Sequence, residues 1–477
     1  MGHQGKIKLS RRDFLRLVGL GAGAAAVNVA AAPTRGLWTD SSTIQKATRP
    51  QDRPTDAAGR PRRAWWVKVV DQPTTEIQWD EVEPISEKDR TVRNIETFTR
   101  YAGADVVETM IAQGNVNQAN HLANDAPGWG LKDQALYNAQ TWDAERPGSF
   151  LGPQTAPTPE SLGVPKWTGS PEEASKMIRA AMRHFGAARV TFLELDENTK
   201  KFIYSNDPDG KPIVFEDIDQ AYESDQKRVI PNKAKWVIIY SIRMSMETLR
   251  RAPTHIACQT TLGAYGRSRQ IQGLTQEFLR GLGYQGLGES SANALGIAPA
   301  FAVLSGMGEL GRHNRVITPE FGPMVRIFKL ITDLPVAVDK PINANIIDFC
   351  KKCKKCAEAC PAGALSFDNE PSWQVRGPWN NPGHKAWFED SVKCMKYWET
   401  IGNNCTICFA VCPFSKEDKA WIHNWVKAGI STMPIMDGFI RSMDDAFGYG
   451  VQADPAGWWD LDLPEYGIDT EATVVEE

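Results

Sequence analysis

The sequence predicts an α/β or α+β core joined to a small cysteine-rich module. Strands alternate with helices over residues 170–335, and eight of the nine cysteines lie between Cys350 and Cys412. A chain of 477 residues that is 42% hydrophobic and 23% charged is long enough for several domains with an ample core. The formal net charge of −4 argues against a strongly basic nucleic-acid-binding protein.

The N-terminus has the layout of an export signal. Basic residues, among them the Arg11-Arg12 pair within Ser10–Leu15, precede an apolar stretch rich in Gly and Ala that runs to Ala32. The paired arginines match the twin-arginine pattern, and an ordinary helix with a chance arginine pair is the alternative. Residues 1–32 carry five Lys/Arg and one Asp, a net +4, so the rest of the chain carries −8. We expect a twin-arginine signal at 1–32 and a soluble mature protein outside the cytoplasm.

The next two regions differ in how clearly they can be interpreted. Residues 33–160 show few periodicities, and we expect only that this N-terminal region packs on the core. The core itself, predicted over 161–340, begins with a helix that Ser170-Pro171-Glu172-Glu173 starts through a capping box and that Gly186 stops. Runs of β-branched and aromatic residues then predict strands at 188–193 and 236–240.

A second long helix and a glycine-rich segment complete the predicted core. The helix covers about 263–281, with Ile271, Leu274 and Phe278 on one stripe. Segment 300–314 contains three glycines with the spacing of a dinucleotide-binding motif but without its strand–helix context. Glycine also lets a backbone approach a large cofactor closely, and this second interpretation is the preferred one.

The end of the chain is acidic. From Arg441 onward there are ten Asp/Glu and no further Lys/Arg. A solvated tail is the simplest interpretation of such a run. The pair Trp458-Trp459 within it predicts that part of segment 426–477 packs back on the core.

The cysteines predict a ferredoxin-like module over 341–425. The run Cys350-x2-Cys353-x2-Cys356-x3-Cys360-Pro matches the bacterial [4Fe–4S] pattern residue for residue. A second run has Cys405, Cys408 and Cys412-Pro, and its leading cysteine lies further away, at Cys394. Sets of four cysteines also bind zinc, but the spacing and the two Cys-Pro endings favour iron–sulfur clusters.

The motif type implies that the fourth cysteine of each run ligates the other cluster. Cluster one would then take Cys350, Cys353, Cys356 and Cys412, and cluster two Cys360, Cys394, Cys405 and Cys408. Cys258 is left over and is predicted to be a buried apolar thiol. A two-cluster unit needs far fewer residues than this chain has, so a further cofactor or substrate pocket is expected.

The whole pattern resembles the catalytic subunit of the corrinoid- and iron–sulfur-dependent reductive dehalogenases of organohalide respiration. Besides the signal and the clusters, the segments Arg62–Val67, Glu309–Asn314, Thr318–Pro323 and Thr332–Pro335 look like family sequence. The resemblance implies a nitroreductase-like core that buries a cobalamin-type corrinoid in its base-off form. Two [4Fe–4S] clusters would pass electrons to cobalt, whose Co(I) state removes halide from an organohalide.

The resemblance also implies site residues. The family's proton-donating tyrosine matches Tyr265, its cation Arg326 and its polar amide Asn293. A tyrosine keeps its proton at neutral pH, and a guanidinium stabilises the phenolate. The simpler alternatives are packing for Tyr265, a surface salt bridge for Arg326 and a turn position for Asn293. Two further tyrosines, Tyr240 and Tyr284, are rival proton donors.

Further contacts and partners are implied less directly. The residues expected to approach the corrinoid are Gly306, Gly308, Gly311 and, as a structural or contacting residue rather than a cobalt ligand, His313. The family implies a small integral-membrane anchor protein, a respiratory electron donor and a homodimer, with no nucleic acid. Two alternatives are an exported electron-transfer subunit and an epoxyqueuosine-reductase-like enzyme, the latter disfavoured by the export signal and the acidic charge.

Overall fold

The computed structural model describes residues 55–145, 148–291, 293–415, 427 and 452–468. The predicted signal at 1–32 therefore lies outside the described residues, as does much of the acidic segment. Among the described residues, no helix combines the length and the apolar character that a membrane crossing requires.

A four-stranded antiparallel sheet forms the centre of the fold. Its strands lie in the order β2 (Arg189–Glu194), β6 (Trp236–Arg243), β10 (Val325–Thr332) and β7 (Gly286–Leu287). Both faces are buried, and most residues of the two central strands are apolar on each side. The antiparallel pairing makes the core α+β, the second of the two classes that the sequence predicts.

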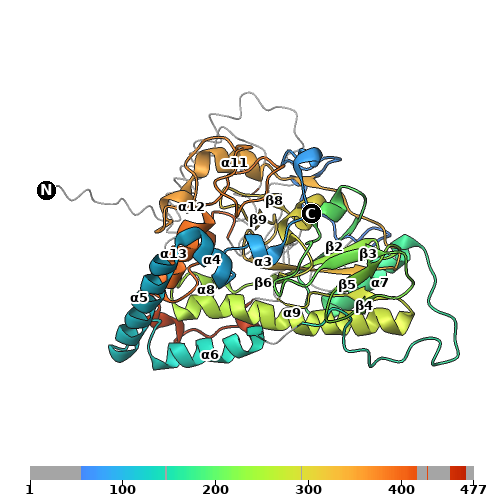
Figure 1. Cartoon of the computed structure of the whole chain (residues 1–477), viewed down its shortest axis with the longest axis horizontal. Helices are drawn as coiled ribbons and strands as arrows, with labels where there is room; N and C mark the ends of the chain where they lie inside the picture. Colours follow the sequence, from blue (N-terminus) through green and yellow to red (C-terminus); the bar gives the residue numbers. More distant parts are fainter. Residues whose placement is uncertain (1–54, 146–147, 292, 416–426, 428–451, 469–477) are drawn as a thin grey trace, which may run out of the picture.

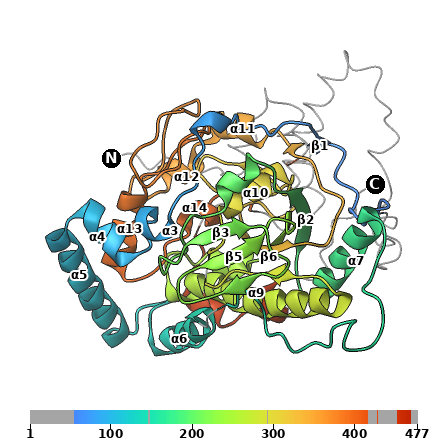
Figure 2. The ribbon, with the colours of Figure 1, turned by 45° about the vertical axis from the view of Figure 1, so that its right-hand side comes forward.

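Helices cover the two faces of this sheet. Ile238, Tyr240 and Ile242 of β6 point to the face covered by α7 (Pro171–His184) and α9 (His255–Leu282). The alternate residues Val237 and Ile239 point to the other face, where α10 (Ala298–Leu304) packs. Figure 1 shows α9 running for most of the width of the molecule, and in the view of Figure 2 it lies below β5 and β6.

The predicted core elements are confirmed, with one difference. Helix α7 begins with the predicted capping box at Ser170, and α9 ends at Gly283 in a left-handed conformation. Helix α9 starts two turns earlier than predicted, and Leu274 on its expected apolar stripe is 41% exposed. Its buried face instead includes Gln272 and Gln276, whose amide N–H groups donate to backbone carbonyls, and the Gln272 side-chain oxygen accepts from the backbone N–H of Glu289.

The N-terminal region wraps around this core. Helix α5 (Ala104–Ala123) packs against α13 (Ser391–Ile401), and α6 (Leu131–Glu145) against α9 (Figure 1). The other elements of this region are β1 (Lys68–Val69), the 3-10 helix η3 (Trp79–Glu81), α3 (Glu87–Arg90) and α4 (Ile95–Ala102).

Short elements complete the architecture. A small three-stranded sheet has the order β3 (Ile213–Glu216), β5 (Arg228–Pro231) and β4 (Tyr222–Glu223). Two further strand pairs are β8 (Glu309–Leu310) with β9 (Val316–Ile317), and β1 with β11 (Ile342–Asn343). The remaining helices are η4 (Thr199–Phe202), α8 (Met246–Leu249), α11 (Ile346–Cys353), α12 (Lys355–Glu358), α14 (Ile407–Ala410), η6 (Ala456–Trp458) and η7 (Glu465–Gly467). Helices α11 to α14 carry most of the cysteines of the module.

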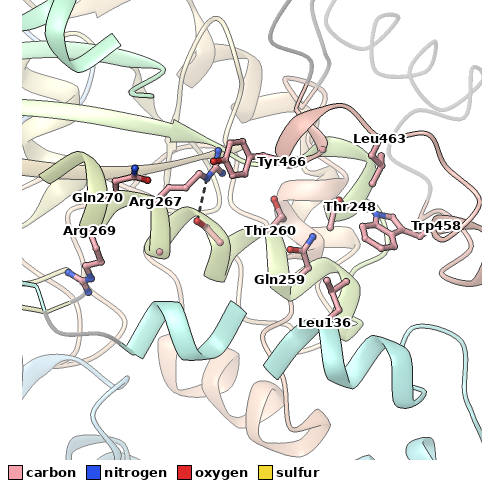
Figure 3. Close-up of a pocket in the computed structure, with 13 residues that line it drawn as sticks. Leu136, Thr248, Gln259, Thr260, Arg267, Arg269, Gln270, Trp458, Leu463 and Tyr466 are labelled. Atoms are coloured by element: carbon pink, nitrogen blue, oxygen red, sulfur yellow. Dashed lines mark hydrogen bonds between the residues drawn. The ribbon is translucent and has the colours of Figure 1, made fainter. Parts of the chain in front are cut away.

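The described part of the acidic segment lies against α8 and α9. The indole nitrogen of Trp458 donates to Thr248 at 3.1 Å, and Arg267 stacks over the ring of Tyr466 at 4.8 Å. Figure 3 shows these side chains around a hollow beside α9, with the Arg267 hydrogen bond to the Gly263 carbonyl as a dashed line. Residues 452–468 therefore pack on the core, as the tryptophan pair predicts for part of the tail.

Candidate active site

One cavity connects the core with the cysteine module. It holds about 1950 Å³ of empty space, including its solvent-open side. Its core wall comes from α9, β10 and the segment around α3, and its other wall from the cysteine module. Its polar and sulfur-bearing lining includes Glu87, Arg93, Tyr204, Tyr265, Asn293, Arg326, Cys360, Cys394, Cys405 and Cys408.

Tyr265 is buried on the wall of this cavity. Its side chain is 5% exposed, and its ring packs edge-on against Phe328 of β10, with 5.6 Å between the ring centroids. The phenol donates to Asn293 Oδ1 at 3.4 Å and accepts from Arg93 Nη1 at 3.4 Å. The Arg326 guanidinium lies 5.5 Å from the ring centroid. The three residues predicted for proton transfer are thus together, with a fourth that was not predicted.

The surroundings of Tyr265 change its acidity. Burial alone raises the pKa of the phenol, but the charges of Arg93 and Arg326 and two hydrogen bonds outweigh burial and lower it to about 7. The proton is therefore held much less tightly than on a free tyrosine, while the anion that remains after its transfer is stabilised by both guanidiniums. This combination suits a proton donor that works near neutral pH.

The structure gives Arg326 and Asn293 positions that fit their predicted roles. Arg326 follows the strand alternation onto the α9 face of β10, where its Nη2 donates to Thr261 at 3.2 Å. Its Nε is buried and has no hydrogen-bond partner among the described residues. Asn293 has a φ of 63°, so it is a turn residue as well as a partner of Tyr265.

Arg93 is the site residue that the sequence did not reveal. It lies between α3 and α4, in the N-terminal region without clear periodicities, and belongs to no recognisable motif. Its distance from Tyr265 along the chain is 172 residues. Only the folding of the N-terminal region over the core brings the two side chains together.

The rival tyrosines are used for packing. Tyr240 is fully buried in the sheet, and its hydroxyl donates to the carbonyl of Ser268 at 3.2 Å. Tyr284 donates to the carbonyl of Trp167 at 3.0 Å. Neither lines the cavity, so among the three candidates Tyr265 has the position that a proton donor needs.

The eight clustered cysteines form two neighbouring groups. Cys356 is electrostatically coupled to Cys350, Cys353 and Cys412, which are the ligands expected for cluster one. Cys394, Cys405 and Cys408 are each coupled to Cys360, which is the set expected for cluster two. The two groups meet where Cys356 lies near Cys408.

The donor chemistry of these groups fits iron–sulfur clusters. Burial, together with the neighbouring thiols, raises the pKa of Cys350, Cys405 and Cys408 to about 12 each. Thiolates so close together and so buried need cationic metal to compensate their charge. Among the described residues, no three thiol, imidazole or carboxylate groups converge tightly enough to hold one metal ion. Cys258 stands apart: it is buried, and Asn404 donates to its sulfur at 3.1 Å.

The glycines of the segment 300–314 lie against other parts of the chain. A Cβ atom added to Gly306 would lie 2.1 Å from the Lys340 carbonyl oxygen, and one on Gly308 2.4 Å from that of Ile317. At Gly311 the Ile317 side chain would be 2.4 Å away. These glycines let the chain approach itself, and none of them lines the large cavity. The role that the structure shows for these glycines is close packing of the backbone, and the corrinoid contact expected for them stays a prediction.

His313 also lies outside the cavity lining. It is 2% exposed, and its ring lies 5.5 Å from that of Phe409. Burial and the charge of Arg315 lower its pKa to about 3, so the imidazole is neutral at physiological pH. Neighbouring Arg312 donates to the carbonyls of Cys350, Ser366 and Asp368 and so ties the core to the cysteine module.

Comparison with known proteins identifies the family. Residues 62–336 match the family described as reductive dehalogenase subunit, and residues 349–415 match the 4Fe-4S double cluster binding domain. The chain belongs to the reductive dehalogenase family. The family match covers more than half of the chain and includes Arg93, Tyr265, Asn293 and Arg326.

Curated reductive dehalogenases and solved structures are similar to this chain. The tetrachloroethene reductive dehalogenase of Sulfurospirillum multivorans is 35% identical over 64% of this chain and 63% of its own length. The chloroethene reductive dehalogenase of Dehalococcoides mccartyi strain VS is 27% identical over 97% of this chain and 98% of its own length. The structure of the catabolic reductive dehalogenase NpRdhA matches with a TM-score of 0.59 at 23% identity, over 84% of this chain and 51% of that one. This last match shows a shared fold.

The two cysteine groups lead to a first prediction. In this reductive dehalogenase, Cys394→Ala should remove one cluster and leave the other, because the cysteines that raise the pKa of Cys394 are Cys408 and Cys360, both of the second group. Iron analysis after anaerobic reconstitution should fall from about eight to about four irons per chain. Cys258→Ala is the matched control and should keep both clusters. Full iron content in Cys394→Ala would contradict the proposed ligand set.

The electrostatics of Tyr265 lead to a second prediction. Arg93→Gln should raise the pKa of Tyr265 above its value of about 7, because it removes the first of the two charges that stabilise the phenolate. Ultraviolet titration of the phenolate, with Tyr265→Phe subtracted, measures this pKa. Arg100→Gln, on the exposed side of α4, is the control and should leave the titration unchanged. An unaltered titration in Arg93→Gln would show that Arg93 does not act on the phenol.

Proposed function

We propose that this chain is the catalytic subunit of a reductive dehalogenase that replaces a halogen of an organohalide with hydrogen. The observation that carries the proposal is the position of Tyr265 between two guanidinium groups, on one wall of a cavity whose other wall holds Cys360, Cys394, Cys405 and Cys408. A proton donor and an electron supply thus face the same space. Because the chain spans less than two thirds of the length of the first relatives it matches, the activity is proposed from these residues.

The cavity suits a corrinoid in the base-off form. From the module side it is lined by Trp379, Trp398 and Thr406, whose side-chain nitrogen or hydroxyl atoms are buried without a hydrogen-bond partner among the described residues. Such atoms fit the amide groups at the rim of a corrin ring. The lining, as far as the structure describes it, contains no histidine, which agrees with a cobalt that has no protein ligand. A solved reductive dehalogenase with a similar fold has been described in terms of B12-dependent dehalogenation, which supports the same cofactor class here.

When bound, the corrinoid would supply cobalt in a state that breaks the carbon–halogen bond. Tyr265 then gives its hydroxyl proton to the carbon that has lost its halogen. Arg93 and Arg326 hold the resulting phenolate, in keeping with their effect on the pKa of Tyr265. The same positive charges favour halide in the cavity. In total, one organohalide, two electrons and one proton give one carbon–hydrogen bond and one halide ion.

The residues that would hold the electron supply follow from the two cysteine groups. Cys350, Cys353, Cys356 and Cys412 would bind one [4Fe–4S] cluster, and Cys360, Cys394, Cys405 and Cys408 the other. The second group lines the cavity, so its cluster would be the immediate donor to the corrinoid. The first group would take electrons from a respiratory donor.

Location and partners are proposed from the sequence. The twin-arginine pattern at Ser10–Leu15 supports export of the folded protein to the outer face of the cytoplasmic membrane. A small integral-membrane protein would then anchor it, and two copies would form a homodimer. Fractionation of cells expressing the native chain or an Arg11→Lys/Arg12→Lys variant measures the location. Retention of only the variant in the cytoplasm is expected.

The alternatives predict different cofactor contents and substrates. An exported electron-transfer subunit would contain iron without cobalt, whereas the proposed enzyme should contain about eight irons and one cobalt per chain. An epoxyqueuosine-reductase-like enzyme would act on tRNA. A panel of chlorinated ethenes, alkanes and aromatics with reduced viologen, read out by halide release and beginning with tetrachloroethene, tests the proposed class.

Replacing the proposed donor tests the mechanism. Tyr265→Phe should keep its iron and cobalt but slow halide release about 10²–10⁴-fold, the usual contribution of a general acid. Tyr240→Phe is the matched control and should keep turnover, because its hydroxyl only bonds a backbone carbonyl in the core. Arg326→Lys should also slow the reaction, since an ammonium cannot reproduce the planar guanidinium beside the ring. Full turnover by Tyr265→Phe would exclude Tyr265 as the donor.

A further inference from the structure

We propose that Arg312 sets the order in which the two iron–sulfur clusters accept electrons, by giving cluster one the higher reduction potential. The inference rests on the proposed ligand sets, in which the first group of cysteines binds cluster one and the second group binds cluster two. A positive charge beside a cluster favours the reduced form, because reduction adds one electron. The cluster that lies beside the stronger uncompensated charge therefore has the higher potential.

One short hairpin brings two arginines to the cysteine module. Strands β8 and β9 are antiparallel and are joined by residues 311–315. Strand β8 packs against α11, which carries Cys350 and Cys353 (Figure 1). Arg312 and Arg315 both lie in the connecting turn, and their side chains have different partners in the module.

Arg312 is bonded to the backbone around the first group. Its Nε and Nη2 donate to the carbonyl of Cys350 at 2.9 and 2.7 Å. Its Nη1 donates to the carbonyls of Ser366 and Asp368 at 2.7 Å each. The guanidinium is thus fixed within one residue of a proposed ligand of cluster one.

The thiols that surround Arg312 all belong to the first group. Burial lowers the pKa of Arg312, and the charges of Cys350, Cys356 and Cys353 oppose this change. Burial raises the pKa of Cys350 to about 12, and a hydrogen bond from the backbone N–H of Arg312 to its sulfur opposes that rise. Positive charge close to the ligands and N–H groups bonded to their sulfurs both raise the potential of a cluster.

The charge of Arg312 has no counter-ion in the protein part that the structure describes. Its residue is 1% exposed, and its guanidinium donates to carbonyl oxygens without forming an ion pair with a carboxylate. The carboxylate of Asp368 accepts from the hydroxyl of Ser366 instead. A buried charge without a counter-ion is costly. The thiolates of cluster one would supply the missing negative charge, so the residues around Arg312 fit an anionic group.

Arg315 has a different environment. Its Nη2 donates to Glu389 at 2.7 Å, and its side chain is 37% exposed. Burial lowers its pKa, but Glu389, followed by Cys394 and Cys408, outweighs burial and raises it. Glu389 therefore lies beside the second group as well, where it cancels much of the charge of Arg315. Partial exposure weakens that charge further, because water and salt screen it.

The unequal pairing of the two arginines predicts the order of reduction. Cluster one, beside the unpaired Arg312, would accept the first electron. Cluster two, whose cysteines line the cavity, would keep the lower potential and so be the stronger reductant beside the proposed corrinoid. Each reduction takes up one electron, and no bond and no proton needs to change. Arg312 is thus a positioning residue for the electron supply and does not touch the substrate.

An anaerobic redox titration of the fully loaded enzyme tests the inference without measuring turnover. Dithionite with mediators sets the potential, and electron paramagnetic resonance follows the reduced clusters. The native enzyme should show two separate waves. Arg312→Gln should move the higher wave to a more negative potential and leave the lower wave in place. Arg312→Lys should keep the higher wave near its native position, because it keeps the charge although it loses the planar fork.

Three results of this titration would overturn the inference. These are a single wave for both clusters in the native enzyme, an unmoved higher wave in Arg312→Gln, and a shift of the lower wave instead. Equal loss of iron in Arg312→Gln and Arg312→Lys, with no shift of the remaining wave, would indicate a purely structural role and would overturn it as well.

Lys352→Gln is the matched control. Lys352 lies on α11 between Cys350 and Cys353 in the sequence, but its side chain is exposed. Its charge is therefore screened, and the variant should leave both waves nearly unchanged. A shift as large as that of Arg312→Gln would show that any nearby cation acts equally, which contradicts a specific role for Arg312.

Glu389→Gln provides a second test that does not alter Arg312. It removes the carboxylate that pairs with Arg315, so it should move the lower wave to a less negative potential and leave the higher wave in place. This variant decides the question if Arg312→Gln does not retain about eight irons per chain, and an unmoved lower wave would then overturn the inference. Low iron in the native enzyme would instead refute the ligand sets, and absence of halide release would refute only the proposed function.

Discussion

The packing of α9 against β10 is the contact on which the candidate site depends. Tyr265 projects from the helix and Arg326 from the strand into one layer, with Phe328 between sheet and ring. A buried phenol would normally become a weaker acid. Here two guanidiniums reverse that effect, because at low dielectric a nearby positive charge acts strongly on the phenolate. Burial would destabilise the Tyr265 phenolate if no charge were nearby. The same burial strengthens the stabilising effect of the two guanidiniums on that phenolate.

Holding α9 in this position requires buried polar contacts as well as apolar packing. Gln272 and Gln276 lie on the buried face of the helix and bond to carbonyls of the segments around Phe150 and Gly286. Each amide N–H group that is bonded in this way avoids the penalty of an unpaired buried donor. The long helix is thereby fixed in rotation, and Tyr265, two to three turns earlier on it, is held in a single orientation toward the cavity.

The cysteine module is joined to the core where the cavity forms. Arg312, at 1% exposure, donates to three carbonyls of the module and stacks over Trp387. Helix α5 of the N-terminal region also packs against α13, which carries Cys394. The module therefore closes the cavity that the core leaves open. In the proposed reaction the proton would come from the core wall, which carries Tyr265, and the electrons from the module wall, which carries Cys360, Cys394, Cys405 and Cys408.

The sequence by itself determined several helices and strands of the core and the type of residue expected to bind the iron–sulfur clusters. The capping box at Ser170, the strands β2 and β6 and the cysteine spacing depend on neighbouring residues, and local patterns of this kind can be read without a fold. The family resemblance added Tyr265, Arg326 and Asn293. Only the tertiary structure decided that Arg93, from a region with few periodicities, lies beside Tyr265, and that the glycines of 306–311 lie against other parts of the chain. Contacts between residues far apart in the chain leave no local pattern, because they arise from how whole elements pack rather than from how one element folds.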